Sequence, residues 1–463
     1  MESLVEENAR LRQEVVELKA TIERLERRVQ ELLRALEEAQ RAGKRQAAPF
    51  SRRGAKAYPA KPGRKTGARY GRRCRRPIPK QVDQSLEAEL PGCCPHCGGE
   101  LEESKIENQY QTEIPKPQIE RIEFHIHFGR CKGCGRRVQG QHPRQTSDAV
   151  GSAASQLGAR AVALASELNK GLGLSYGKTA VVLDTAFGQV SRGGLAQALH
   201  RVAQKAEPTY QELVQQIRGS PSVTPDETGW KVGGRLWWMW AFCSEKLTVY
   251  SIQPGRGYEP AIAVLGADFD GFLVRDGWIV YQRFAHAFHQ TCLAHLLRRC
   301  REMLEMARPG AAELPRTVKE ILQASLQLRD RRDQNRISAR GLAIARGQLE
   351  SRLDRTLNRS YRSPTNQRFA NHLRREREAI FTFLYCPGLE ATNYRAEQAI
   401  RPMVVTRKVW GGNRTENGAH TQSVLVSILQ TCRQQLRPAT GFLERLLHLR
   451  TPQALDLTSP APR

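Results

Sequence analysis

A heptad repeat of leucines fills the first 42 residues and leaves few folds open to them. Leucine recurs at every seventh position, and a second, mostly β-branched position follows four residues after each leucine. The members are Leu4, Leu11, Leu18, Leu25 and Leu32, with Asn8, Val15, Ile22, Val29 and Leu36. This seam predicts a parallel two-stranded coiled coil in which Asn8 fixes the register. The alternative is an amphipathic helix that packs on its own domain, but we expect self-association.

A one-signed basic segment follows the heptads. Residues 41–80 contain fifteen Lys and Arg and no Asp or Glu, with Gly, Pro and Ala between them. Such a segment cannot fold by itself, so we expect a disordered arm over 43–85 whose cations lie along DNA phosphates without reading bases. A solvated linker is the alternative. The arginines assigned to DNA are Arg72, Arg73, Arg75 and Arg76.

The charge of the whole chain points to a polyanionic partner. Of its 463 residues, 73 are Lys or Arg and 47 are Asp or Glu, which gives a net charge of +26. Double-stranded DNA is the expected partner, although a ribosome or an anionic membrane surface would also attract such a charge. We expect a soluble, cytoplasmic, nucleoid-associated protein, because the start lacks an apolar signal region and no apolar run reaches a membrane-spanning length.

Two Cys-x-x-Cys pairs predict a structural zinc site. In a reducing compartment, thiols are free or bind metal, so the spacing of the cysteines is informative. The pairs are Cys94 with Cys97 and Cys131 with Cys134, each followed by glycine, and the alternating apolar residues of 119–128 predict ribbon strands between them. Four thiolates complete a tetrahedral shell and leave no open position.

Residues 151–206 have the periodicity of helices. One apolar stretch ends at Leu168, a second covers 178–187, and a third begins after Ser191, which is a suitable N-cap. Two helices joined by a three-residue turn in a basic protein are typical of a helix-turn-helix DNA reader. An ordinary three-helix packing unit fits the pattern equally well.

From residue 221 the residue pattern becomes typical of β-strands. Residues 221–256 predict a three-strand meander, a helix follows over 258–265, and 271–276 predict a short buried strand that ends at Asp276. Asp226 lies at the start of the meander. Because Pro225 precedes it, we expect the strand to begin at Asp226 or to carry a bulge.

A third candidate carboxylate, with two polar neighbours, lies far downstream of Asp226 and Asp276. Asn393, Glu397 and Arg401 are spaced four apart and would share one helix face. By spacing alone, a solvated salt bridge is favoured over a catalytic carboxylate.

Four sequence words resemble one family of bacterial transposases. They are DETGW at 226–230, LVRDGWIVY at 273–281, CLAHLLRR at 292–299 and NYRAEQAIRPMVVTRKVWGGNRTENGA at 393–419. Together with the heptads and the CPHCGGEL knuckle, in the same order, they resemble the "insertion sequence sixty-six" family. The resemblance implies a ribonuclease-H-like catalytic domain with a DDE triad, here Asp226, Asp276 and Glu397.

The implied chemistry requires divalent cations. Two Mg²⁺ or Mn²⁺ ions per active site, held by the triad, would promote in-line displacement at a DNA phosphodiester. Arg401, Arg407 and Lys408 are expected to hold phosphates, and Asn393 to orient Glu397. His295 shares a helix face with Cys292, where ordinary packing is favoured over metal or DNA binding.

These features predict a multidomain α/β protein. Two other readings are a non-catalytic zinc-ribbon and helix-turn-helix regulator derived from a transposase, and a ribonuclease-H-type RNA nuclease, which the coil and arm argue against. Homo-oligomers and accessory transposition proteins are the expected protein partners. The expected domains are a coiled coil (1–42), the arm (43–85), a zinc ribbon (86–145), a helical domain (146–206), a catalytic core (207–300 and 380–432), a helical insertion (301–379) and a C-terminal helix and tail (433–463).

Overall fold

The computed structural model describes residues 2–43, 78–112, 119–151, 155–187, 190–307, 310–449 and 451–457. Contacts divide the chain into two units, one of Met1–Pro49 with Glu123–Arg463 and one of Phe50–Ile122. The four arginines that were assigned to the basic arm, Arg72, Arg73, Arg75 and Arg76, lie outside the described residues, so their role stays a prediction.

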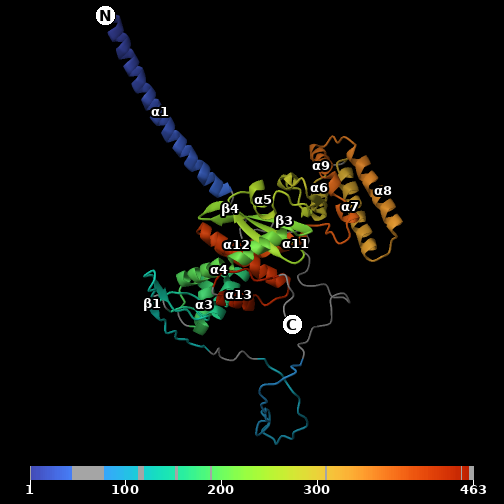
Figure 1. The fold of residues 1–463 in the computed structure, drawn as a ribbon. Helices are drawn as coiled ribbons and strands as arrows, with labels where there is room; N and C mark the ends of the chain where they lie inside the picture. Colours follow the sequence, from blue (N-terminus) through green and yellow to red (C-terminus); the bar gives the residue numbers. More distant parts are fainter. Residues whose placement is uncertain are drawn as a thin grey trace. The chain divides into compact units, whose positions relative to one another are not determined.

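A five-stranded mixed sheet is the centre of the larger unit (Figure 1), in the order β5–β4–β3–β6–β7. The strands are β3 (Ser222–Val232), β4 (Arg235–Cys243), β5 (Thr248–Gln253), β6 (Phe272–Arg275) and β7 (Phe288–Thr291). The first three form the predicted antiparallel meander, whereas β6 runs parallel to both β3 and β7. The predicted helix is α5 (Tyr258–Leu265), and the mixed α/β fold class is confirmed.

The expectation for Pro225 was wrong on both counts. β3 begins at Ser222, and its pairing with β4 runs without a bulge from Thr224 to Val232. On its other side, β3 pairs with β6 only through Ser222 and Val223. The proline therefore lies beyond the β6 ladder, where its missing N–H interrupts no bond to that strand.

Alternate residues of the sheet supply two separate cores. On one face, Met239 and Ala241 of β4 join residues of helix α11 (Tyr394–Trp410). On the other face, Trp240 and Phe242 pack with α5 and with the long helix α4 (Arg192–Arg218). Helix α12 (Glu416–Gln434) contacts β5 and contributes to both cores.

Helix α12 also provides hydrogen-bond acceptors for backbone N–H groups on the outer edge of strand β5. Its hydroxyls at positions i, i+4 and i+8 accept bonds from three backbone N–H groups of the strand. The bonds run from Ile252, Tyr250 and Thr248 to Ser423, Ser427 and Thr431, at 3.1, 2.8 and 3.2 Å. An unpaired edge strand invites pairing with another chain, so this row of hydroxyls closes the sheet on that side.

Four further helices of more than ten residues lie between β7 and α11. They are α6 (Leu293–Glu305), α7 (Glu313–Asp333), α8 (Ala339–Leu357) and α9 (Pro364–Arg375), followed by the short α10 (Thr382–Tyr385). Figure 1 draws α7, α8 and α9 side by side. Their apolar faces form a third core that includes Val274 of β6, so this insertion shares packing with the sheet. The boundary placed at residue 300 falls inside α6.

The segment before the sheet is helical, as predicted. It contains α2 (Ala159–Ser166), a π-helical turn (Glu167–Gly171), α3 (Tyr176–Phe187) and then α4. Ser191 caps α4 by accepting a bond from the Gly194 N–H at 3.0 Å. Because α4 runs on to Arg218 and packs against the sheet, the boundary placed at 206 falls inside this helix. A helix-turn-helix role for the segment stays a prediction.

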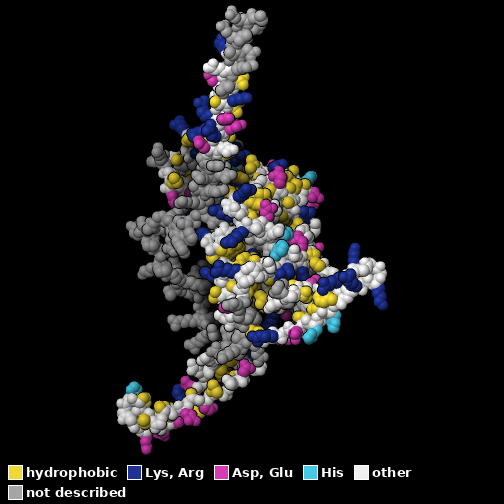
Figure 2. Space-filling model, turned by 90° about the vertical axis from the view of Figure 1, so that its left-hand side faces the viewer, with side chains coloured by type: hydrophobic (Ala, Val, Ile, Leu, Met, Phe, Trp, Pro, Cys, Tyr) yellow, Lys and Arg dark blue, Asp and Glu magenta, His cyan; other side chains and the backbone are white. Residues whose placement is uncertain are grey.

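Two terminal features complete the larger unit. Helix α13 (Ala439–His448) follows α12, inside which the boundary placed at 432 falls. At the other end, α1 (Glu2–Gly43) is one continuous helix, and its described seam residues are exposed, namely Leu11, Val15, Leu18, Ile22, Leu25, Val29 and Leu32. Figure 2 shows hydrophobic, basic and acidic side chains interspersed along it. The pairing of this seam with a second helix stays a prediction.

The predicted ribbon is shorter than expected. Among the described residues of this region, only β1 (Phe128–Arg130) and β2 (Arg137–Gln139) pair, and residues 119–127 are in no strand. Alternation makes a strand only where a neighbouring strand supplies the ladder bonds, and none is described beside 119–127. No helix within the described ranges combines the length and apolarity that a membrane span requires.

The hydroxyl row on α12 generates a stability prediction. Ser427→Ala should lower the free energy of unfolding by about 1–3 kcal/mol, because the buried N–H of Tyr250 loses its acceptor. Denaturant titration of the full chain measures this difference. Ser360→Ala, at an exposed position, is the control and should change little. Equal stabilities of the two variants would contradict the role of the hydroxyl row.

Candidate active site

The parallel register of β3 and β6 brings two aspartates to neighbouring positions. Ser222 pairs with Phe272 and Val223 with Leu273, a constant offset of 50 residues. Three residues further along each chain lie Asp226 and Asp276. Since adjacent strands are about 4.8 Å apart, continuing the register places these aspartates side by side where β6 ends.

Local bonds fix the orientation of each aspartate. Asp226 Oδ1 accepts from the Glu227 N–H at 2.9 Å. Asp276 follows the last residue of β6, and its Oδ1 accepts from the Trp278 N–H at 3.0 Å, which closes a tight turn. Both carboxylates therefore keep at least one oxygen directed away from these backbone bonds.

Glu397 reaches the same region from the first turn of α11. The even-numbered residues of β3, such as Trp230 and Val232, face α11, and Asp226 belongs to this set. The charges of Asp276 and Glu397 both act on Asp226. The fold thus brings the three predicted carboxylates to one side of the sheet. Within the described ranges, however, no three His, Cys, Asp or Glu side chains are close enough to ligate one ion.

Asp226 has a strongly altered acidity. Burial raises the pKa of Asp226 to about 7, and the negative charges of Glu227, Asp276 and Glu397 add to this increase, against a smaller lowering by the Glu227 N–H bond. Such a carboxylate is costly to ionise in the folded chain. Concentrated negative charge of this kind is common at sites that bind cations or transfer protons.

Two side chains of α6, the His295 imidazole and the Arg298 guanidinium, lie near Glu397. Its Oε1 lies 3.6 Å from His295 Nε2 and 3.7 Å from Arg298 Nη2. The sequence favoured plain packing for His295 and gave no role to Arg298. The signal was the i, i+3 spacing of these two residues within CLAHLLRR, but their partner lies about a hundred positions downstream.

Asn393 joins the starts of α6 and α11. Its backbone N–H donates to Cys292 Sγ at 3.3 Å, and its carbonyl accepts from the Glu397 N–H at 3.1 Å. The Asn393 side chain is buried, and neither its oxygen nor its nitrogen has a hydrogen-bond partner among the described residues. The predicted orienting role of Asn393 therefore has a physical route through the backbone.

The three cations predicted on α11 differ in environment. Arg401 and Lys408 are exposed. Arg407 is half-buried and donates to the Thr228 hydroxyl at 2.9 Å and to the Gly229 carbonyl, which ties α11 to β3. Burial lowers the pKa of Arg407, which nevertheless remains a strong base. Phosphate binding by these three residues stays a prediction.

A fourth carboxylate, that of Glu227, lies on the face of β3 opposite to Asp226. Its side chain is 2% exposed, accepts a hydrogen bond from Tyr281 Oη at 2.7 Å and forms an ion pair with Arg256 at 2.7 Å. Burial raises the pKa of Glu227, while these two partners lower it. Glu227 was not predicted from the sequence, although the alternation of a strand places it and Asp226 on opposite faces.

A buried ion pair links the helical insertion to the strand that carries Asp276. Arg275 Nη1 lies 2.7 Å from Glu376 Oε2, with side chains 3% and 1% exposed. Thr291 Oγ1 donates to the same oxygen, and Gln282 Nε2 donates to Glu376 Oε1 at 2.7 Å. Although burial raises the pKa of Glu376, Arg275 and Thr291 outweigh it and hold that pKa below its usual value. Arg275 Nη1 also donates to the Asp276 carbonyl at 3.2 Å.

The same end of α9 packs on the turn after Asp276. A Cβ atom added to Gly277 would lie 2.6 Å from His372 Cε1, so any larger residue there would have to displace this ring. His372 precedes Glu376 by one helical turn. The insertion therefore supports the Asp276 turn through a charge pair and a ring contact, neither of which the sequence revealed.

The two cysteine pairs form matching turns. Gly98 N donates to Cys94 O at 2.8 Å, and Gly135 N donates to Cys131 O at 2.9 Å. Gly98 and Gly135 have φ of +74° and +68°, which explains the glycine after each pair. Backbone N–H groups of the following residues lower the pKa of Cys94 and of Cys131. Cys97 and Cys134 are exposed thiols, and the two turns belong to different units.

The acidity of Asp226 generates a pH-dependent prediction. Its folded pKa of about 7 lies above the ordinary value of 3.8, so its contribution to stability is full below 3.8 and is lost as pH rises through 7. Asp226→Asn should therefore raise the free energy of unfolding at pH 8 by about 2–4 kcal/mol, with a smaller gain near pH 4. Thermal unfolding across this range tests it. Asp270→Asn, at an exposed position, is the control. A gain that does not depend on pH would contradict the assignment.

A comparison with known proteins identifies the family of the chain. The sequence profile described as "Transposase IS66 family" matches residues 155–421, which include all three carboxylates and the helical insertion. The uncharacterized protein y4qI of Sinorhizobium fredii is 25% identical over 274 residues, which cover 53% of this chain and 50% of that protein. The chain thus spans about half the length of this curated relative. Because the profile covers more than half of the chain, the protein belongs to the IS66 family of transposases.

Proposed function

We propose that this protein is an active DNA transposase that cuts DNA at the ends of an insertion sequence and joins them to a target. The observation that carries the proposal is the position of Asp226, Asp276 and Glu397 on one side of the sheet, where the charges of Asp276 and Glu397 add to the effects of burial and of Glu227 on the acidity of Asp226. An antiparallel meander followed by two parallel strands also agrees with the ribonuclease-H-like core that the family resemblance implies.

The donor chemistry of the three carboxylates suits hard divalent cations such as Mg²⁺ or Mn²⁺. Asp226 and Asp276 would hold two ions together with Glu397. Bound cations would supply charge stabilisation at the attacking and leaving oxygens of a phosphodiester. Their positive charge would also relieve the repulsion that raises the pKa of Asp226.

The reaction proceeds in two displacements at phosphorus. A water oxygen first attacks the scissile phosphorus and loses its proton, and the bond to the 3′ oxygen breaks, leaving a 3′-hydroxyl and a 5′-phosphate. That 3′-hydroxyl then attacks a phosphorus of the target strand, with release of the target's own 3′ oxygen. No covalent intermediate with the protein forms, so no nucleophilic side chain is required.

The remaining residues position the carboxylates and the DNA. His295 and Arg298 hold Glu397, and Asn393 fixes the start of its helix. Arg401 and Lys408 lie exposed further along α11 and would contact phosphates that flank the cut. Arg407 attaches α11 to β3 by donating a hydrogen bond to the Thr228 hydroxyl. Figure 2 shows Lys and Arg side chains spread over one face of the body, in keeping with a DNA partner.

Two accessory parts serve assembly and DNA capture. The exposed seam of α1 would pair with a second copy and so bring two DNA ends together. The basic arm would add affinity for DNA that does not depend on the DNA sequence.

Cys94, Cys97, Cys131 and Cys134 would bind one structural zinc, since each turn directs N–H groups at the sulfur of its first cysteine.

The triad is tested with conservative substitutions. Asp226→Asn, Asp276→Asn and Glu397→Gln should each abolish strand cleavage and joining, while binding to the same DNA ends persists, because each change removes one ligand charge without changing shape. Incubation with the element's ends and Mg²⁺ measures both steps, and Asp270→Asn serves as the control. Near-normal joining by one variant would remove that residue from the triad. DNA binding without cleavage by the unmodified chain would favour the regulator instead.

The zinc proposal predicts one tightly held zinc per chain. Elemental analysis of the purified protein should find this stoichiometry, and Cys131→Ser with Cys134→Ser should lose it, because two thiols no longer complete the shell. Cys93→Ser, next to the first pair, is the matched control and should retain the metal. Full zinc retention in the double variant would exclude these ligands.

A further inference from the structure

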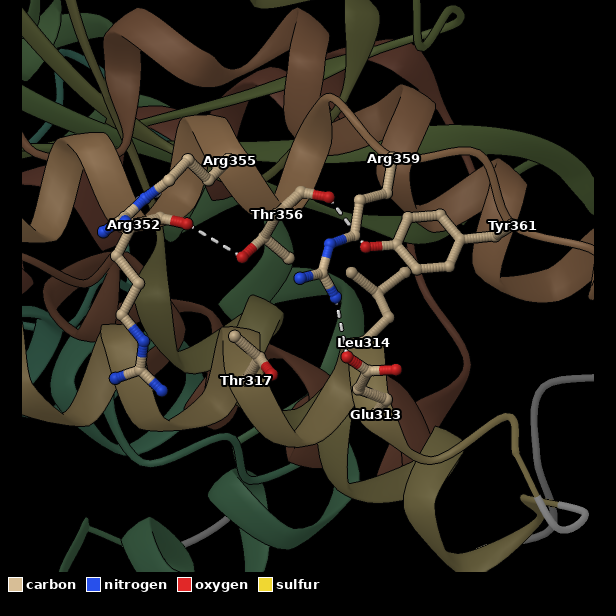
Figure 3. Close-up of a pocket in the computed structure, with 8 residues that line it drawn as sticks. All are labelled: Glu313, Leu314, Thr317, Arg352, Arg355, Thr356, Arg359 and Tyr361. Atoms are coloured by element: carbon tan, nitrogen blue, oxygen red, sulfur yellow. Dashed lines mark hydrogen bonds and ion pairs between the residues drawn. The ribbon is translucent and has the colours of Figure 1, made fainter.

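The helical insertion contains a basic hollow between α7 and α8. Its volume is about 330 Å³, and three arginines, Arg352, Arg355 and Arg359, contribute to its lining (Figure 3). They follow one another at intervals of three and four residues, which is the spacing of one helix face. Glu313 is the one carboxylate of the lining. The wider insertion is also basic, since residues 301–379 contain 18 Lys and Arg against ten Asp and Glu.

Hydroxyl groups define the shape of the hollow. Thr356 Oγ1 donates to the Arg352 carbonyl at 2.8 Å, and Tyr361 Oη donates to the Thr356 carbonyl at 2.7 Å. These bonds hold the end of α8 and the chain that follows it. In Figure 3, Thr317 of α7 lies between the guanidinium groups of Arg352 and Arg359. The hollow therefore offers the guanidinium groups and the Thr317 hydroxyl as donors around one space, while the hydroxyls of Thr356 and Tyr361 donate to backbone carbonyls.

The arginines of this hollow are available to an anion. Arg359 pairs with Glu313 at 2.7 Å and Arg352 with Glu320 at 2.6 Å, but all four side chains are between 43% and 69% exposed. Exposed pairs are weak and are screened by salt, so a phosphate can replace the carboxylate. Arg355 is exposed and forms no ion pair with any described residue; its Nε donates only weakly to the Ser351 carbonyl, at 3.3 Å.

We propose that this hollow, which we call the arginine hollow, binds a backbone phosphate of duplex DNA at a site separate from the three carboxylates. Guanidinium forks match the oxygens of a phosphodiester, and such contacts position DNA without reading its sequence. The choice of DNA over another phosphate source rests on the proposed function. The insertion shares its core with Val274 of β6, so DNA held there keeps a fixed relation to the strand that ends at Asp276.

The experiment measures binding of a short duplex to the full chain carrying Asp276→Asn, which does not cut. Arg355→Gln in this background should weaken binding about eightfold at about 0.1 M salt and reduce the slope of log affinity against log salt by about 0.9, the value for one phosphate contact. Arg340→Gln is the matched control, because Arg340 is exposed on the same helix but does not line the hollow. It should leave the slope nearly unchanged.

A substitution of opposite sign makes the test specific to the hollow. Glu313→Gln removes the carboxylate that competes for Arg359, so it should tighten DNA binding. Equal effects of Arg355→Gln and Arg340→Gln, or no tightening by Glu313→Gln, would overturn the proposal.

Inorganic phosphate at matched ionic strength distinguishes DNA from a small anion. Phosphate that binds the DNA-free chain through Arg355 but does not weaken its DNA binding would assign the hollow to the free ion and overturn the DNA assignment. Because binding is measured without cleavage, failure here leaves the catalytic proposal intact, and absence of cleavage in the unmodified chain leaves the arginine hollow intact.

Discussion

The buried ion pair between Arg275 and Glu376 is the interaction on which the candidate site depends. The two residues are 101 positions apart, and their side chains are almost fully buried. Burying two charges is costly, and here the bonds from Thr291 and Gln282 to Glu376 offset part of that cost. Losing one partner would leave an uncompensated charge, at a cost of about 3–5 kcal/mol. The folding of the insertion is thereby coupled to the turn that carries Asp276.

The two faces of β3 treat carboxylates in opposite ways. Glu227 is paired with Arg256 and Tyr281 on one face, whereas Asp226 on the other has no cationic partner among the described residues and meets the charges of Glu227, Asp276 and Glu397. Repulsion therefore acts most strongly on Asp226, on the side where cations would bind. Asp226 therefore lowers the stability of the fold when it is ionised, and functional sites often keep residues that cost stability in this way.

Local features of this fold were predictable, and long-range ones were not. The meander, helix 258–265 and the Ser191 cap follow from periodicity and capping, which act within a few residues. The alternation over 119–127 misled because a strand needs a neighbour, and Pro225 misled because its cost depends on where β6 stops pairing. The triad came from the family resemblance rather than from spacing. Contacts such as Arg298 with Glu397 join segments about a hundred residues apart, which no local pattern encodes.

The long-range contacts of the insertion give a physical reason for its place within the proposed catalytic core. A surface loop would need only exposed contacts, but α9 places Glu376 and His372 against the turn after β6, and the insertion core takes in Val274. Well-packed interiors transmit displacements because they have little free volume. DNA held at the arginine hollow would therefore act on the Asp276 turn through α9, so the insertion would serve both as a binding surface and as the support that fixes one carboxylate of the triad.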